Sequence, residues 1–379
     1  MIYFDNAATT PVLKNCIDIV EKYNIQCFFN PSARYHTAVD VHKNITHARE
    51  VLANALGCDS SEVFYTSSGS ESDNWAIKGV MKKPNGRLIV SDAEHPAVYN
   101  TALYLKNLGF DVQFCKVLRD GRVDQNHLDE LLTDDTKLVS IMHVNNETGA
   151  INDIESLVSL VKSKTKALFH SDGVQAFGKI PVDVESLGVD MYSISGHKIG
   201  APKGIAALYI KKGVNIVPLI HGGGQENNYR SSTENVSGII ALSVAAQDCM
   251  NYLKTRSVDI YNLRKYIVDN LINELGENIY FSTDFQNSSP YVLNLSIKGV
   301  RGEVLLHSLE EDDVFISTGS ACSSKKGVSR LTRSLNIPEE FREGTIRLSF
   351  SRYSTMDEAK EFIEKVIPRI NQLSRFRRK

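Results

Sequence analysis

Apolar residues follow two different periods along the middle of the chain. From Glu62 onward, short runs rich in β-branched and aromatic residues recur, and longer segments with apolar residues at helical spacing lie between them. The expected strands read EVFYT, RLIVS, VQFCKV, KLVSIMHV and KALFHSD, and the expected helices begin near residues 71, 95, 125 and 154. Because strand and helix alternate at this spacing, the pattern predicts an α/β fold with a mostly parallel sheet and helices on both faces.

Different patterns flank this region and predict a second domain. Residues 12–57 read as mostly helical with a break at Asn30-Pro31-Ser32, and residues 239–276 read as one or two long helices. The C-terminal part mixes the strands YVLNLSI, VFIST and TIRLSFS with helices from residues 302 and 356. Because 379 residues exceed what one core supports, we expect a large domain over residues 12–251. Residues 1–11 and 252–379 are expected to form a smaller α+β domain.

Composition and charge exclude several classes of protein. The chain is 42% hydrophobic and 23% charged, and its formal net charge of -2 gives no general attraction to nucleic acid or to a membrane surface. It contains no apolar run of bilayer length, and MIYFDNAATTP lacks the pattern of a signal peptide. The six cysteines are scattered without a CxxC pair, which argues against a structural zinc or a redox disulfide. We therefore expect a cytoplasmic protein that binds no metal, no membrane and no nucleic acid directly.

One lysine stands in an unusual place. Lys198 lies with Ser195 and His197 in a polar, glycine-bounded turn between the apolar runs MYSI and IAALYI. A lysine beside a hydroxyl and an imidazole at a strand end suits covalent chemistry through its amine. Taken alone, a surface lysine in a tight turn explains the pattern as well, so the neighbouring motifs must decide.

Polar residues also follow the other expected strands. The turn TSSGSE opens a helix, where backbone N–H groups and the helix dipole suit a phosphate, although the same residues also form ordinary turns. The carboxyl ends of parallel strands meet at one edge of a sheet, so these residues are expected to converge. The set comprises Ser70, Glu94, His95, Asn145, Asn146, Ser171, Asp172 and Gln175. A phosphate cradle, a lysine, a carboxylate and an imidazole together predict a pyridoxal phosphate enzyme.

Eleven ordered motifs carry a family resemblance. They include DNAATTP, TSSGSESDNWAIKG, AEHPAV, HVNNETGAI, SDGVQAFGKIPVD, SGHKIGAPKG, HGGGQE, RSSTENV and STGSACSS. The chain resembles the cysteine desulfurases of the NifS/IscS type, in the class V aminotransferase group, over nearly its whole length. The resemblance implies a fold type I pyridoxal phosphate transferase that acts as a homodimer.

The resemblance also implies roles for the residues around the cofactor. Lys198 would be the Schiff-base lysine, and His95 would stack on the cofactor ring. Asp172 would pair with the pyridine nitrogen, and Gln175 with the ring hydroxyl. The phosphate would be held by Gly69, Ser70, Ser195 and His197, together with Thr233 of the second subunit.

Further implied roles concern the substrate and the sulfur. Asn146 and Arg347 would bind the substrate carboxylate, and Cys322 would accept sulfur. Cys322 lies in a small, polar segment with two lysines, which favour a thiolate. The sequence departs from the family at Ser232, where a glycine is usual; a positive φ there would cost about 1 kcal/mol and shift Thr233.

The sequence therefore predicts a homodimeric enzyme that converts L-cysteine to L-alanine and leaves a persulfide on Cys322. The expected recipient of the sulfur is an acceptor protein, such as an iron-sulfur scaffold or a tRNA thiolation enzyme. Two alternatives stay open: a selenocysteine lyase or other class V enzyme, and a sulfur-relay scaffold without turnover.

Overall fold

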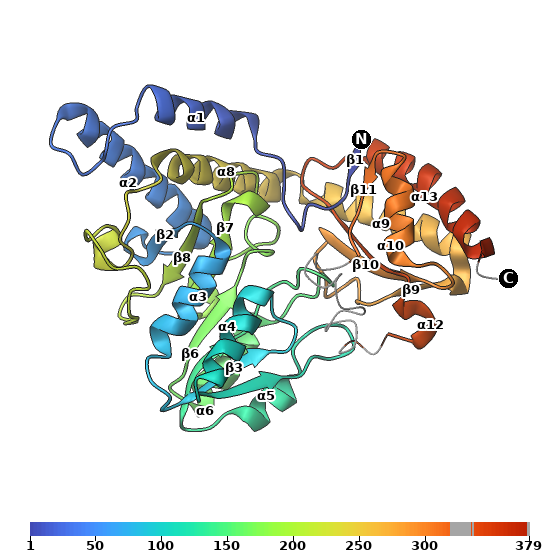
Figure 1. Ribbon diagram of the computed structural model, residues 1–379, viewed down its shortest axis with the longest axis horizontal. Helices are drawn as coiled ribbons and strands as arrows, with labels where there is room; N and C mark the ends of the chain where they lie inside the picture. The colour runs from blue at the N-terminus through green and yellow to red at the C-terminus, as the bar shows by residue number, and fades with distance from the viewer. Residues whose placement is uncertain (319–334, 336, 377–379) are drawn as a thin grey trace.

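A seven-stranded sheet forms the centre of the larger part of the molecule (Figure 1). The structure is a computed structural model that describes residues 1–318, 335 and 337–376. The strand order is β2-β8-β7-β6-β5-β3-β4, in which β8 runs antiparallel to both neighbours and the other pairs are parallel. The strands are β2 (Val63–Thr66), β3 (Arg87–Ser91), β4 (Asp111–Cys115), β5 (Thr136–Ser140), β6 (Leu168–Asp172), β7 (Met191–Ser195) and β8 (Ala206–Ile210).

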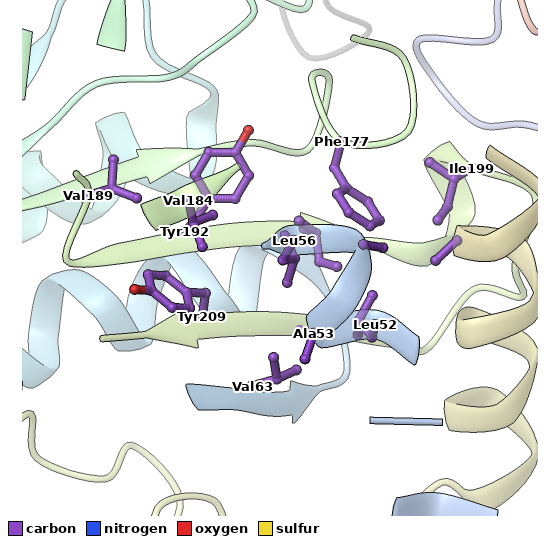
Figure 2. Close-up of a cluster of buried hydrophobic side chains, with 14 of the residues drawn as sticks. Leu52, Ala53, Leu56, Val63, Phe177, Val184, Val189, Tyr192, Ile199 and Tyr209 are labelled. Atoms are coloured by element: carbon purple, nitrogen blue, oxygen red, sulfur yellow. The ribbon is translucent and has the colours of Figure 1, made fainter. Parts of the chain in front are cut away.

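Both faces of this sheet are buried, as the apolar strand sequences predict. Successive side chains of a strand point to opposite faces, and in β3 Ile89 enters one hydrophobic cluster whereas Leu88 and Val90 enter another. Figure 2 shows the first cluster, where side chains of one long helix pack against β2, β7 and β8. The helices of this part are α1 (Lys14–Ile25), α2 (His36–Leu56), α3 (Gly69–Val80), α4 (Pro96–Asn107), α5 (Gln125–Leu131), α6 (Ile154–Lys164), α7 (Val184–Leu187) and α8 (Val236–Thr255).

A second hydrophobic cluster joins the two ends of the chain. Ile2 and Phe4 pack there with residues beyond 259, and the Phe4 and Phe350 rings meet edge to face with centroids 5.0 Å apart. Both termini accordingly lie in this smaller part in Figure 1. Its elements are β1 (Ile2–Tyr3), α9 (Ser257–Leu275), β9 (Ile279–Phe281), β10 (Val292–Ile297), α10 (Gly302–Glu310), β11 (Val314–Phe315), α12 (Glu339–Arg342), β12 (Thr345–Ser349) and α13 (Met356–Phe376). The exact domain limits drawn from the sequence stay a prediction.

Small sheets hold this part together. Strands β12, β10 and β9 form an antiparallel sheet, and β1 pairs in parallel with β11.

Some elements differ from the sequence prediction. The run KLVSIMHV forms a strand only to Ser140, since the Met142 N–H bonds to the Glu94 carboxylate at 2.8 Å instead of to β3. Among the described helices, none has the length and apolar character to cross a bilayer.

Candidate active site

A cavity of about 360 Å³ lies where the connections after β2, β3, β6 and β7 meet the N-terminal segment and β12. Its walls include ten of the residues that the sequence marks for a cofactor or substrate. They are Gly69, Ser70, His95, Asn146, Asp172, Gln175, Ser195, His197, Lys198 and Arg347. Since these residues span positions 69 to 347, the fold brings together side chains that are far apart in the sequence. Their individual roles remain predictions.

Lys198 is held by the backbone of the N-terminal segment. It ends a short 3-10 turn, η2 (Gly196–Lys198), in the connection between the antiparallel strands β7 and β8. Its Nζ donates hydrogen bonds to the carbonyl oxygens of Ala7 at 2.6 Å and Ala8 at 2.7 Å. Burial and the nearby Arg347 guanidinium lower the pKa of Lys198 to about 8. A substantial fraction of this amine is therefore a neutral nucleophile near physiological pH.

Two buried carboxyl groups and an imidazole lie together on another wall. The metal-ligand-type atoms of Asp73, His95 and Asp172 all lie within 4.8 Å of one another. Burial raises the pKa of Asp172, while His95, a hydrogen bond from the Val174 N–H at 2.9 Å and Lys198 act in the opposite direction. Burial and then the charge of Asp172 raise the pKa of Asp73 well above its usual range. Asp73 is therefore the one that holds a proton, which leaves Asp172 as the anion of the pair.

His95 has a defined tautomer. It caps the N-terminus of α4, and its Nδ1 accepts the Ala97 N–H at 3.1 Å. Burial lowers the pKa of His95, so the ring is mainly neutral and carries its proton on Nε2. The ring therefore offers a single N–H donor.

The start of α3 forms a cradle at one end of the cavity. Ser68 caps the helix by accepting the Glu71 N–H at 3.1 Å. A Cβ on Gly69 would lie 2.9 Å from Val174 Cγ2 and 3.4 Å from Ser195 Cβ, so no larger residue fits without displacement. His197 lies nearby with its Nδ1 3.1 Å from Thr9 Oγ1, and burial lowers the pKa of His197 to about 4. A neutral imidazole and exposed helix N–H groups suit an anion such as phosphate.

Arg347 forms another wall from β12. Its Nη2 donates to Asp5 Oδ1 at 2.6 Å, and its Nη1 donates to the Asn146 carbonyl oxygen at 2.9 Å. Its Nε is buried without a hydrogen-bond partner in the described part of the chain. Arg347 also lines the cavity, where a guanidinium suits a carboxylate ligand.

One predicted residue, Thr233, does not line this cavity, and another, Cys322, cannot be placed. Thr233 lines a separate cavity of about 190 Å³ with Tyr65 and Arg230, and Cys322 lies outside the described residues. Ser232 is not among the residues with positive φ, so the strain considered for it does not arise. The segment around Thr233 is held by ion pairs from Arg49 to Glu226 and from Arg230 to Glu71. Thr233 is therefore not among the residues that line the cavity around Lys198.

Sequence reasoning missed three residues of the site. Asp5 pairs with Arg347, Asp73 faces Asp172, and Lys179 contacts Gln175. Asp5 and Asp73 belong to the motifs DNAATTP and TSSGSESDNWAIKG, so their positions were marked although their contacts were not. Lys179 lies four residues after Gln175, a spacing that brings side chains together in a helical turn.

Comparisons with known proteins agree with this geometry. Residues 2–362 match the family model for class-V aminotransferases. The curated cysteine desulfurase IscS of Dictyoglomus turgidum is 38% identical over 383 residues, covering 99% of this chain and 97% of the relative. The chain belongs to the class-V aminotransferase family. A solved structure of a NifS-like protein matches this class-V chain with a TM-score of 0.92 at 35% identity, covering 98% and 99% of the two chains. The structure "SspA in complex with cysteine" matches with a TM-score of 0.83 at 32% identity, covering 94% and 100%. The predicted fold type I architecture is confirmed.

Class-V enzymes of this kind use pyridoxal 5′-phosphate, and the described residues fit that cofactor. Gly69 lets the start of α3 approach Val174 and Ser195 closely at the cavity wall, since a Cβ there would lie 2.9 Å from Val174 Cγ2. Lys198 supplies an amine with a lowered pKa, and the buried Asp172 supplies a carboxylate for a protonated ring nitrogen. The cofactor predicted from the sequence is confirmed by family membership, whereas the assignment of each contact remains a proposal.

Proposed function

We propose that this class-V enzyme is a cysteine desulfurase, which converts L-cysteine to L-alanine and transfers the sulfur to Cys322. The observation that carries the proposal is the placement of Lys198 between a phosphate cradle and Arg347 in one cavity. The cradle suits the cofactor's phosphate, the lysine suits its aldehyde, and the guanidinium suits an amino-acid carboxylate. The full-length relatives named cysteine desulfurase support the same reaction.

Lys198 and His95 carry the proton transfers of the proposed reaction. The bound cofactor supplies an electron sink that makes the Cα proton of an amino acid acidic. Lys198 would bind the cofactor. Once its amine is released from the cofactor, that amine would be the base that takes the Cα proton. Because the pKa of Lys198 is lowered to about 8, its amine both accepts and returns a proton near neutral pH. His95 holds a proton on Nε2 beside the same cavity and assists.

Arg347 orients the substrate. The Arg347 guanidinium lines the cavity, so a carboxylate bound there gains a charge-assisted hydrogen bond beside the existing contact with Asp5. Asn146, whose backbone carbonyl oxygen accepts a hydrogen bond from Arg347, lies in the same wall. Both residues thereby fix the carboxylate end of the amino acid and leave its side chain to face the sulfur acceptor.

Sulfur transfer needs no external oxidant. The thiolate of Cys322 attacks the sulfur of the bound cysteine, the bond from that sulfur to Cβ breaks, and a sulfur–sulfur bond forms on Cys322. The carbon takes up a proton, so L-cysteine and one enzyme thiol give L-alanine and one persulfide. The other cysteines are unsuited to this role where they are buried: burial raises the pKa of Cys16 and Cys249 to about 11.

The proposal extends to the assembly and the acceptor. Thr233 does not line the cavity around Lys198, which supports a homodimer in which Thr233 reaches the phosphate of the partner's cofactor. The IscS and NifS names of the relatives support delivery of the sulfur to iron-sulfur cluster assembly, with tRNA thiolation as the other destination. The proposed location is the cytoplasm.

The test combines product analysis with intact-mass measurement. The purified protein with pyridoxal phosphate and L-cysteine should yield L-alanine and gain the mass of one sulfur atom. Cys322→Ser should bind the cofactor normally and gain no sulfur, whereas Cys27→Ser serves as the matched control and should behave as wild type. Sulfur on the Cys322→Ser protein would show that another residue is the acceptor. Absence of alanine from a protein that binds the cofactor would refute the desulfurase reaction itself.

A further inference from the structure

Lys179 lies in a helical turn directly after β6. The Phe177 N–H bonds to the Gly173 carbonyl at 2.9 Å, and the Ile180 N–H bonds to that of Ala176 at 3.0 Å. This turn packs closely between α8 and the Lys198 turn. The close approach requires a glycine at position 178, because Gly178 has φ +74° and a Cβ there would lie 2.8 Å from Cys249 Sγ. The close approach buries Lys179, which is 6% exposed. A lysine is rarely buried to this degree without a function or a partner.

The contact of Lys179 is with Gln175, one helical turn earlier. Lys179 Nζ donates to Gln175 Oε1 at 2.5 Å, and Gln175 Nε2 donates to the Ala7 carbonyl at 2.9 Å. The same Ala7 oxygen accepts a hydrogen bond from Lys198 Nζ at 2.6 Å. Lys179, Gln175 and Lys198 are therefore linked through three hydrogen bonds, two of which share the Ala7 carbonyl oxygen.

This network fixes which end of the Gln175 amide can reach a ligand. An amide has one oxygen and two N–H donors, and its two orientations have nearly the same shape. The ammonium of Lys179 accepts no hydrogen bond, so it bonds only to the oxygen end. The Gln175 oxygen already accepts a hydrogen bond from Lys179, and one of its N–H groups already donates to Ala7. The group that Gln175 can offer to the cavity is therefore its second N–H.

We propose that Lys179 is a positioning residue that locks the Gln175 amide, so that Gln175 donates an N–H to the ring oxygen of the cofactor. The inference rests on the proposed function, because it requires pyridoxal phosphate joined to Lys198. An N–H donor stabilises negative charge on the ring oxygen and thereby lowers the pKa of the nitrogen that joins Lys198 to the cofactor. Without Lys179, only the bond to the Ala7 carbonyl holds the amide, and a flipped amide would turn its oxygen toward the ring oxygen, so that two acceptors face each other.

The charges around Lys179 explain why it suits this role once the cofactor is bound. Burial, together with the cations of Lys198, Arg347 and Arg352, lowers the pKa of Lys179 to about 7. When the Lys198 nitrogen is bonded to the cofactor, it no longer carries the ammonium charge that lowers the pKa of Lys179. Lys179 then keeps its proton more readily, so the lock strengthens in the loaded enzyme.

The test is a pH titration of the absorbance of the cofactor bound through Lys198. In Lys179→Met the midpoint should rise by about one pH unit, because the donor and a positive charge are both lost. Gln175→Ala should also raise it. Adding Lys179→Met to Gln175→Ala should then give little further change, since coupled residues are not additive. The other charged groups near Lys198 are unaltered in these variants: Asp5, His95, Asp172, His197 and Arg347.

Two controls keep the outcome interpretable. Lys203→Met removes an exposed positive charge near His197 and should leave the midpoint unchanged, because exposed charges are screened. Thermal unfolding should show that Lys179→Met folds, since methionine fills the same space without a buried charge. Equal shifts by Lys179→Met with and without Gln175 would mean that Lys179 acts through its charge alone, which overturns the proposal. An unchanged midpoint in Lys179→Met would also overturn it, whereas failure of the wild type to bind the cofactor would instead refute the proposed function.

Discussion

The acidity of Lys198 gives the sharpest prediction. The pKa of Lys198 is lowered from 10.5 to about 8 by burial and by Arg347, while Asp172 and Asp5 act in the opposite direction. At pH 7 about one amine in ten is then neutral, roughly 300-fold more than for an unperturbed lysine. Substitutions on opposite walls of the cavity should therefore shift the pKa of Lys198 in opposite directions. Arg347→Met should raise it by about one pH unit, and Asp172→Asn should lower it.

The assay measures reductive methylation of the cofactor-free protein by formaldehyde and cyanoborohydride. The rate at Lys198 is read by peptide mass mapping across pH 6 to 11, because only the neutral amine reacts. The exposed Lys83 on the same map serves as an internal standard for reagent reactivity. The expected midpoint for Lys198 in the wild type is about 8.

Two results would contradict this reasoning. A wild-type midpoint near 10.5 would mean that Lys198 is solvated and that burial has no effect on its pKa. Shifts of the same sign in Arg347→Met and Asp172→Asn would mean that local rearrangement, rather than charge, controls the amine. Circular dichroism of both variants should match the wild type, so that unfolding is excluded as a cause.

Three other substitutions test separate parts of the structure. Gly69→Ala should weaken cofactor binding about tenfold, measured by fluorescence titration, because the new Cβ meets Val174 at 2.9 Å and closes the cradle. Arg49→Met should lower the free energy of unfolding in urea by about 3 kcal/mol, since it leaves the Glu226 carboxylate buried without its ion pair; a change below 1 kcal/mol would contradict this. His143→Gln should test a buried neutral imidazole. Burial lowers the pKa of His143 to about 4 in the folded protein, whereas in the unfolded protein this histidine gains a proton as the pH falls below 6.5. The stability of the wild type relative to His143→Gln should thus fall by about 1.4 kcal/mol per pH unit between pH 6 and 4.5.

The sequence predicted the central sheet well because its physical signal is local. Strands buried on both faces are continuous apolar runs, and RLIVS matches β3 residue for residue. The expected strand VFIST contains β11, although only Val314–Phe315 form the strand. The first strand, β1, could not be read in this way, because it has two residues and exists only by pairing with a segment more than 300 residues away. Short strands of this kind carry no periodicity of their own.

The candidate site was predictable to the extent that its residues follow strands. Asp172 ends β6, the Lys198 turn follows β7, and His95 lies in the connection after β3; the topology of a parallel sheet gathers such positions at one edge. Lys179 was not predicted, because a lysine after a strand reads as a surface residue and only the packing of α8 buries it. Asp5 was not predicted as a partner of Arg347, since the pair spans 342 residues.

The N-terminal segment changes how the Lys198 turn should be understood. The carbonyl oxygens of Ala7 and Ala8 hold the lysine amine, and Asp5 holds the arginine that lowers the pKa of that amine. Because Asp5 itself raises the pKa of Lys198, the Asp5–Arg347 pair presents two opposing charges to the lysine from the smaller part of the molecule. A substrate carboxylate that binds Arg347 adds a third charge, which favours the protonated form of any free amine nearby. The proposed role of Arg347 would thus couple substrate binding to the acid–base state of Lys198, so a substitution of Arg347 should alter the pH profile of turnover as well as the affinity for cysteine.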